Sequence, residues 1–92
     1  MNLRHFDALG MRAARYVSAL YGDCDVTFYS GVDASGQLWA GVMIQGSNDN
    51  APVQYGISGV PLLLTVAEER VEQELVQQMS DFVQHHASQQ NP

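Results

Sequence analysis

The chain has 92 residues, a length that supports one hydrophobic core and leaves no room for a second domain. Hydrophobic residues make up 46% of it, which is typical of a folded globule and too much for an intrinsically disordered chain. Ten acidic residues against four basic ones give a formal net charge of −6, and none of the bases is lysine. The missing lysine excludes Schiff-base enzymes, lysine-activated serine hydrolases and the phosphate loop of nucleotide-binding proteins.

Cysteine content and hydropathy favour a soluble protein of a reducing compartment. The single cysteine, Cys24, cannot form a disulfide within the chain, so the cytoplasm is the predicted location. Charged side chains interrupt the apolar residues of the N-terminal segment, unlike those of a signal peptide. The longest apolar run, residues 60–64, contains Pro61 and is too short to span a bilayer.

The first predicted element is a helix between Asn2 and Gly22. Apolar side chains recur at three- and four-residue spacing from Leu3 to Leu20, which is the period of one helix face. Asn2 is the predicted N-cap and Gly22 the predicted stop. Gly10, in the middle, either weakens the helix or lets another element approach it closely.

The middle of the chain alternates apolar and other residues, as strands do. Residues 25–30, 38–45 and 53–57 are the predicted strands. The polar segment 33–36 ends in glycine and predicts a hairpin turn between the first two strands. Residues 62–64 are either a possible short fourth strand or the buried lead-in to the last helix.

The last segment predicts a second helix. Thr65 and Glu68 have the spacing of a capping box, in which each side chain satisfies a free backbone N–H. An apolar stripe follows, made of Val71, Leu75, Met79 and Phe82. Residues 87–92 are predicted to be a frayed polar tail.

The predicted order is therefore α-β-β-β-α, in a single domain over residues 1–92. Short connections favour a three-stranded antiparallel meander. Two helices packed on one face of that sheet bury both apolar stripes, so the predicted fold class is α+β.

Charge is segregated along the chain. Residues 1–20 hold three arginines against one aspartate, and the remainder holds nine acids against Arg70. The three arginines fall within an arc of about 80° on a helical wheel, opposite the apolar stripe. This basic ridge is either a solvated face or a contact surface, because guanidinium groups bind phosphates and carboxylates through paired donors.

The acids allow the same two interpretations. Glutamates in the first turn of a helix stabilise its dipole without any ligand, but those beyond it are free to meet a partner. The candidate partner-binding residues are Arg4, Arg12, Arg15, Asp23, Asp25, Asp33, Asp49, Glu69, Glu72 and Glu74.

No constellation of catalytic or metal-binding residues is visible in the sequence. Cys24 has no second cysteine at redox or metal spacing, and a small buried thiol is its expected role. His85 and His86 are adjacent, so on a helix they point about 100° apart and cannot share a metal without other ligands. No catalytic residue, metal or cofactor is predicted, and the expected function is not enzymatic.

Tyr29, Trp39 and Tyr55 share one face of the sheet in some registers, as the residues of a base-stacking platform do. The strand region carries aspartates and no base, so packing against the helices is favoured over nucleic-acid stacking.

The element order over residues 2–86 is similar to that of the double-stranded-RNA-binding domain. That family grips phosphates with lysines at the start of its last helix, where this chain has residues 65–69 with two glutamates. Free duplex nucleic acid is therefore not a predicted partner.

In length, in its excess of Asp and Glu and in its lack of catalytic motifs, the chain resembles the small acidic anti-CRISPR proteins of phages. The resemblance implies a non-enzymatic inhibitor that docks on a basic channel of a CRISPR surveillance complex and blocks nucleic-acid binding. The carboxylates would then face lysines, while Arg4, Arg12 and Arg15 would reach guide RNA or acidic protein. The predicted partner is thus a basic protein or ribonucleoprotein complex, and no membrane is involved. If a phage encodes the protein, the predicted location is the host cytosol.

Three alternatives remain open at this point. A bacterial secretion chaperone is also small and acidic, and an obligate dimer would favour it. A toxin-immunity protein would co-purify with a basic nuclease. A small enzyme would require a pocket that brings Cys24 or a histidine beside a carboxylate.

Overall fold

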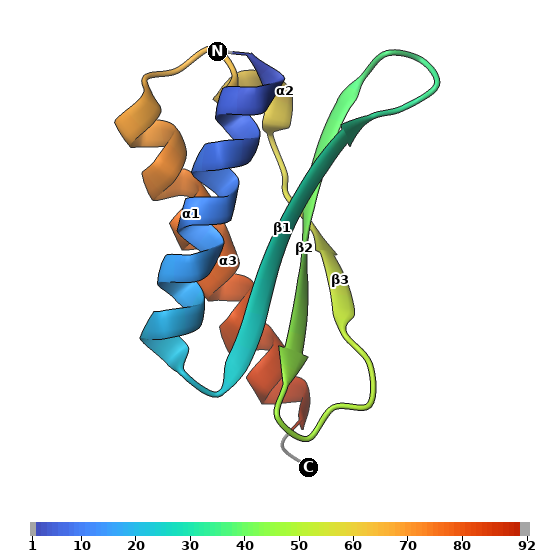
Figure 1. Cartoon of the computed structure of the whole chain (residues 1–92), viewed down its shortest axis with the longest axis vertical. Coiled ribbons are helices and arrows are strands. Elements are labelled where there is room, and N and C mark those ends of the chain that lie inside the picture. The colour runs from blue at the N-terminus through green and yellow to red at the C-terminus, as the bar shows by residue number, and fades with distance from the viewer. Residues whose placement is uncertain (1, 91–92) are drawn as a thin grey trace.

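Helices and strands follow one another in the predicted order in the computed structural model, which describes residues 2–90. In chain order the elements are α1 (Leu3–Tyr21), β1 (Cys24–Val32), β2 (Leu38–Gly46), β3 (Val53–Gly56), α2 (Val60–Leu63) and α3 (Glu68–Gln90). The strands form one antiparallel sheet in the order β1-β2-β3, and both long helices lie on the same side of it (Figure 1). The α+β class and the three-stranded meander are therefore confirmed.

The ends of α1 are where the sequence predicts them. The Asn2 side chain accepts a hydrogen bond from the N–H of His5 at 2.8 Å, and Gly22 ends the helix with a φ of +72°. Gly10 serves close packing, because a Cβ built there would lie 2.2 Å from the ring of Phe28 in β1. The missing side chain lets α1 lie directly against the sheet.

The hairpin between β1 and β2 is also confirmed. The Asp33 carboxylate accepts hydrogen bonds from the N–H of Ser35 and the N–H of Gln37, each at 2.9 Å. It also accepts one from the Ser35 hydroxyl at 2.6 Å, and these hydrogen bonds, that of the hydroxyl most of all, lower the pKa of Asp33. Asp33 therefore holds the turn together, which gives it a structural role apart from any partner.

Residues 62–64 do not form a fourth strand. The short helix α2 covers most of this segment and buries Val60 and Leu63. The predicted capping box is also wrong, because the Thr65 hydroxyl donates to the C=O of Leu62 at 2.7 Å. Thr65 thus closes α2, and α3 begins three residues later at Glu68.

The predicted frayed tail is wrong for residues 87–90, because α3 continues without a break to Gln90. Residues 91–92 lie outside the described part of the chain. The helix extends because its side chains remain helix-compatible to the end, with no glycine or proline before its last residue.

Side chains from both long helices and from the sheet build the core. The largest of those that are fully enclosed are Phe6, Val17, Val42, Ile44, Val71, Leu75 and Met79. The two long helices run in the same direction, since His5 contacts Glu68 and Tyr21 contacts Gln84. The α1–β1 turn, the β2–β3 loop and the last turns of α3 therefore meet at one end of the molecule, opposite the starts of α1 and α3 (Figure 1).

Candidate functional site

Three carboxylates surround Cys24 at the end of the molecule where the α1–β1 turn meets the β2–β3 loop. We call Asp23, Asp25 and Asp49 the acidic end. Pairing of Cys24 with Gly46 brings the start of β1 beside the loop that carries Asp49. An open pocket of about 420 Å³ lies here, lined by residues of the turn, the loop and α3.

The negative charge of the acidic end affects the pKa of the Cys24 thiol. The pKa of Cys24 is raised, first by its partial burial and then by the negative charges of Asp23, Asp25 and Asp49. The four arginines lie elsewhere, three within residues 4–15 of α1 and one in the first turn of α3. No arginine forms an ion pair with these three carboxylates in the described part of the chain.

That histidine, His86, is buried and links three elements. Its Nε2 lies 2.7 Å from Oδ2 of Asp49, and its Nδ1 lies 3.0 Å from the hydroxyl of Tyr55 in β3. The same Asp49 oxygen accepts the N–H of Gly46 at 2.8 Å. The pKa of Asp49 is lowered by the Gly46 hydrogen bond first and by His86 second. Burial and the Asp49 charge together raise the pKa of Tyr55.

Sequence reasoning missed His86, although a signal for it existed. The buried stripe of α3 runs through Val71, Leu75, Met79 and Val83 at intervals of four residues. Continuing at helical spacing reaches residue 86, where a histidine replaces the apolar side chain. A polar residue on a buried helix face must find partners, and here they are Asp49 and Tyr55.

The pocket that an enzyme would require is thus present, because Cys24, His86 and Asp49 all line it. Nucleophilic catalysis also needs a base that is free to take the thiol proton. Both ring nitrogens of His86 already contact other side chains, and the raised pKa of Cys24 favours the protonated thiol. His86, Asp49 and Tyr55 thus form a hydrogen-bond network beside the pocket. They do not activate the Cys24 thiol.

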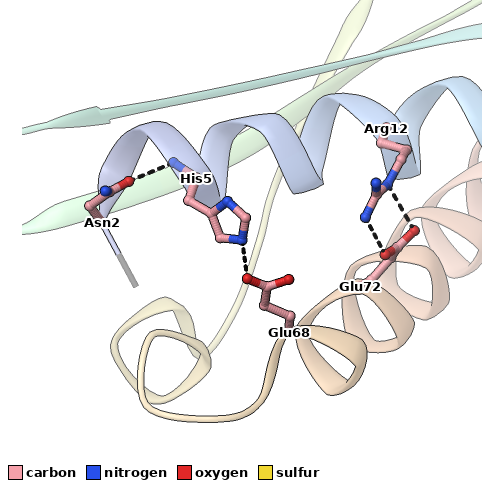
Figure 2. A network of polar contacts seen from close by, with 5 residues as sticks. All are labelled: Asn2, His5, Arg12, Glu68 and Glu72. Carbon is pink, nitrogen blue, oxygen red and sulfur yellow. Dashed lines mark hydrogen bonds and ion pairs between the residues drawn. The ribbon is translucent and has the colours of Figure 1, made fainter.

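A second group of charged side chains joins α1 to α3 near the opposite end. Figure 2 shows two hydrogen bonds from Arg12 to Glu72, with N–O distances of 3.2 and 2.8 Å, and a contact between His5 and Glu68. We call these four residues the helix–helix contact. Arg12 and Glu72 are both solvent-accessible, but each neutralises the other.

The predicted basic ridge is therefore divided. Arg12 turns toward α3, whereas Arg4 and Arg15 are exposed and have no acidic partner in the described part of the chain. Beside Arg12, an open groove of about 660 Å³ runs between the two helices, with Tyr16 and Glu69 in its walls. The wheel places the three arginines together, but the packing of α3 separates them.

The other candidate acids differ in their engagement. Asp23, Asp25 and Glu69 are exposed, with no hydrogen bond or ion pair from their side chains in the described part of the chain. Glu74 is exposed and accepts a long hydrogen bond of 3.5 Å from Gln78. Of the acids named from the sequence, Asp23, Asp25 and Glu69 are therefore the ones available to a partner, and Glu74 is held only weakly.

The aromatic residues do not form one platform. Tyr29 and Trp39 lie on the sheet face away from the helices, with ring centroids 5.7 Å apart. Tyr55 pairs with Val42 on the opposite face, where its ring stacks on Phe82 at a centroid distance of 5.1 Å. Tyr29 and Trp39 thus lie on the open face of the sheet, and Tyr55 lies on the helix-covered face.

Comparisons with protein-family models, curated proteins and solved structures found no match. Within residues 2–90, no set of three or more His, Cys, Asp and Glu side chains is grouped so as to hold a metal ion. The same residues contain no helix with the length and apolar character needed to cross a membrane.

Proposed function

We propose that this chain works by binding, with the acidic end docking on a basic surface of a protein or ribonucleoprotein complex. The observation that carries the proposal is the placement of Asp23 and Asp25. Both are exposed beside Asp49, and neither forms an ion pair with an arginine or histidine in the described part of the chain. Opposite charges on two surfaces speed their encounter and select against acidic partners.

The specific form of the proposal is an inhibitor of anti-CRISPR type. Its carboxylates occupy a lysine-rich channel that otherwise holds target DNA, and so they compete with the phosphates of the target. Such a competitor needs a rigid display of charge, because disordered carboxylates lose entropy on docking. The Asp49–His86–Tyr55 network supports this requirement by tying the β2–β3 loop to β3 and α3.

The test uses the whole chain and purified CRISPR surveillance complexes loaded with guide RNA. The expected result is binding that excludes target DNA and weakens by about tenfold or more between about 50 and 500 mM salt, as screening shortens the range of charge. Failure to bind any of the complexes would overturn the anti-CRISPR form. An obligate dimer, or capture of a basic nuclease, would point to a secretion chaperone or a toxin-immunity protein.

A small cysteine enzyme is the second candidate, favoured by the shared pocket of Cys24, His86 and Asp49. Such an enzyme requires a thiolate at neutral pH, which the raised pKa of Cys24 opposes. The discriminating measurement is the rate of iodoacetamide alkylation against pH. We expect the rate to rise only above the usual range of a free thiol, about pH 8.5. Rapid alkylation below pH 7, lost in His86→Gln, would favour the enzyme instead.

A further inference from the structure

The outer edge of β1 carries backbone groups that the fold leaves unused. β1 is nine residues long and lies at one edge of the sheet. In an antiparallel pair, alternate residues turn both backbone groups toward the neighbouring strand, and the residues between them turn both away. The N–H of Asp33 bonds to Gln37 across the hairpin. The odd-numbered residues of β1 therefore face β2, and the even-numbered residues face outward.

Only part of this outer edge is covered. At Val26 the hydroxyl of Ser18 accepts from the N–H at 2.9 Å and donates to the C=O at 3.3 Å. Farther along, the backbone groups of Phe28, Ser30 and Val32 have no hydrogen-bond partner in the described part of the chain. In Figure 1, β1 passes in front of β2, with α1 beside it and no other element in front. A free edge of this kind is a template for another extended segment.

A shallow groove of about 210 Å³ lies between α1 and this edge. Met11 and Arg15 form its α1 side, and Val26 and Phe28 belong to its β1 side. Met11 is 48% exposed, although it is a large apolar residue. A strand docked on the edge would therefore meet an apolar contact and a cation along one flank.

Positive charge on this side of α1 comes from two unpaired arginines, of which Arg15 lines the groove. Arg4 and Arg15 are eleven residues apart on the same side of α1, a separation of about 16 Å along the helix axis. That distance equals about five residues of extended chain. Asp7, the one acidic residue of α1, lies between them in sequence and accepts a hydrogen bond from the Ser30 hydroxyl at 2.9 Å. The positive charge exceeds the negative charge along this flank.

We propose that the outer edge of β1 binds an extended acidic segment of a partner protein, which adds to the sheet as a further strand. Its backbone pairs with Phe28, Ser30 and Val32, and its carboxylates lie toward Arg4 and Arg15. The site is distinct from the acidic end and does not depend on the function proposed for that end. The length of the free edge sets the length of the segment, and the spacing of Arg4 and Arg15 sets the positions of its carboxylates.

A second copy of this chain fits the edge less well. The twofold axis of such a pair would pass near Ser30, the middle of the free residues, because Ser18 blocks the edge at Val26. Each Ser30 is bonded to Asp7, so the axis would bring two Asp7 carboxylates together. Like charges opposed in this way are destabilising.

The probe is a fluorescein-labelled peptide of about eight residues, alternating valine and threonine, with two glutamates about five positions apart. We expect saturable binding to the full chain by fluorescence anisotropy, weakened about tenfold by Arg15→Gln because a charge-assisted hydrogen bond is lost. Arg70→Gln removes an arginine from α3 and serves as the control, with no expected change. Loss of affinity in both variants, in neither, or no binding at millimolar peptide would overturn the proposal.

Two peptides N-methylated at alternate residues test the backbone pairing without altering the protein. Methylation of the residues that face β1 should abolish binding, and methylation of those that face away should not. Equal affinity of the two methylated peptides would contradict strand addition. A concentration-dependent dimer that Val32→Pro abolishes would show that a second copy of the chain occupies the β1 edge. That result would overturn the acidic-segment proposal.

Discussion

Carboxylates at the two ends of the molecule are used differently. Where α3 begins, Glu68 and Glu72 reach across to His5 and Arg12 in water, and all four side chains of this helix–helix contact are at least 36% exposed. Where α3 ends, the side chains of Asp49 and His86 are 9% and 7% exposed. Water screens the exposed contacts at the start of α3 and so weakens them. The Asp49–His86 contact is shielded from water, so its electrostatic attraction is stronger. Burial therefore separates Asp49, whose contacts hold the fold together, from Glu68 and Glu72, whose contacts are weakened by water.

The largest expected effect comes from removing the centre of the buried network. His86→Ala deletes a buried side chain, removes the partner of the Tyr55 hydroxyl and leaves the Asp49 carboxylate with the N–H of Gly46 alone. We expect a loss of about 3 kcal/mol in the free energy of unfolding, measured by urea denaturation. His85→Ala, at the exposed neighbouring position, should cost less than about 0.5 kcal/mol. Equal losses in the two variants would show that burial does not separate them.

Apolar packing of α1 on the sheet gives a reference for these polar contacts. Gly10→Ala forces a methyl group into the ring of Phe28, where no space exists for it. We expect a loss of about 2 kcal/mol in the free energy of unfolding, although alanine favours a helix more than glycine does. The paired variant Gly10→Ala with Phe28→Leu should recover part of it. A more stable single variant would show that the close approach has no energetic weight.

Acid should weaken the buried network selectively. The pKa of Asp49 is lowered in the folded protein, so the folded state binds its proton less readily than the unfolded chain does. The stability that this group supplies is fully present above its unfolded pKa, about 3.9, and is lost as the pH falls through the lower folded value. Urea midpoints below about pH 4 should therefore fall more steeply for the wild type than for Asp49→Asn. Parallel curves would contradict the assignment.

The smallest effect belongs to the helix–helix contact. A double-mutant cycle with Arg12→Gln and Glu72→Gln should give a coupling energy below about 1 kcal/mol, because both side chains are hydrated. Added salt should reduce it further. A coupling energy of about 3 kcal/mol that resists salt would place this pair in the same energetic class as the buried network.

Local patterns predicted the elements because their signals are local. The α1 cap at Asn2, its stop at Gly22 and the hairpin built by Asp33 each depend on residues within four positions along the chain. The capping box at Thr65 was wrongly predicted for the same reason. The Thr65 hydroxyl has local backbone groups on both sides of it in sequence, and it donates to the C=O of Leu62 at the end of α2 instead of capping the start of α3.

The candidate site was predicted only in part because its partners are distant in sequence. Arg12 meets Glu72 sixty residues away, a match that requires the relative placement of two helices. Tyr55 lies on the helix-covered face because β3 pairs with β2 in one register, and a shift of one residue would move it to the other face. His86 stood on a predictable buried stripe, but nothing local identified Asp49 as its partner.

The central claim is that the exposed aspartates of the acidic end bind a basic partner while the acids at the start of α3 do not. Two variants with equal net charge test it most directly: Asp23→Asn with Asp25→Asn, and Glu69→Gln with Glu74→Gln. The measurement is the dissociation constant of each for a guide-loaded CRISPR surveillance complex in the same salt. We expect at least about tenfold weaker binding for the aspartate pair and little change for the glutamate pair. The reverse order, or an equal loss in both, would contradict it.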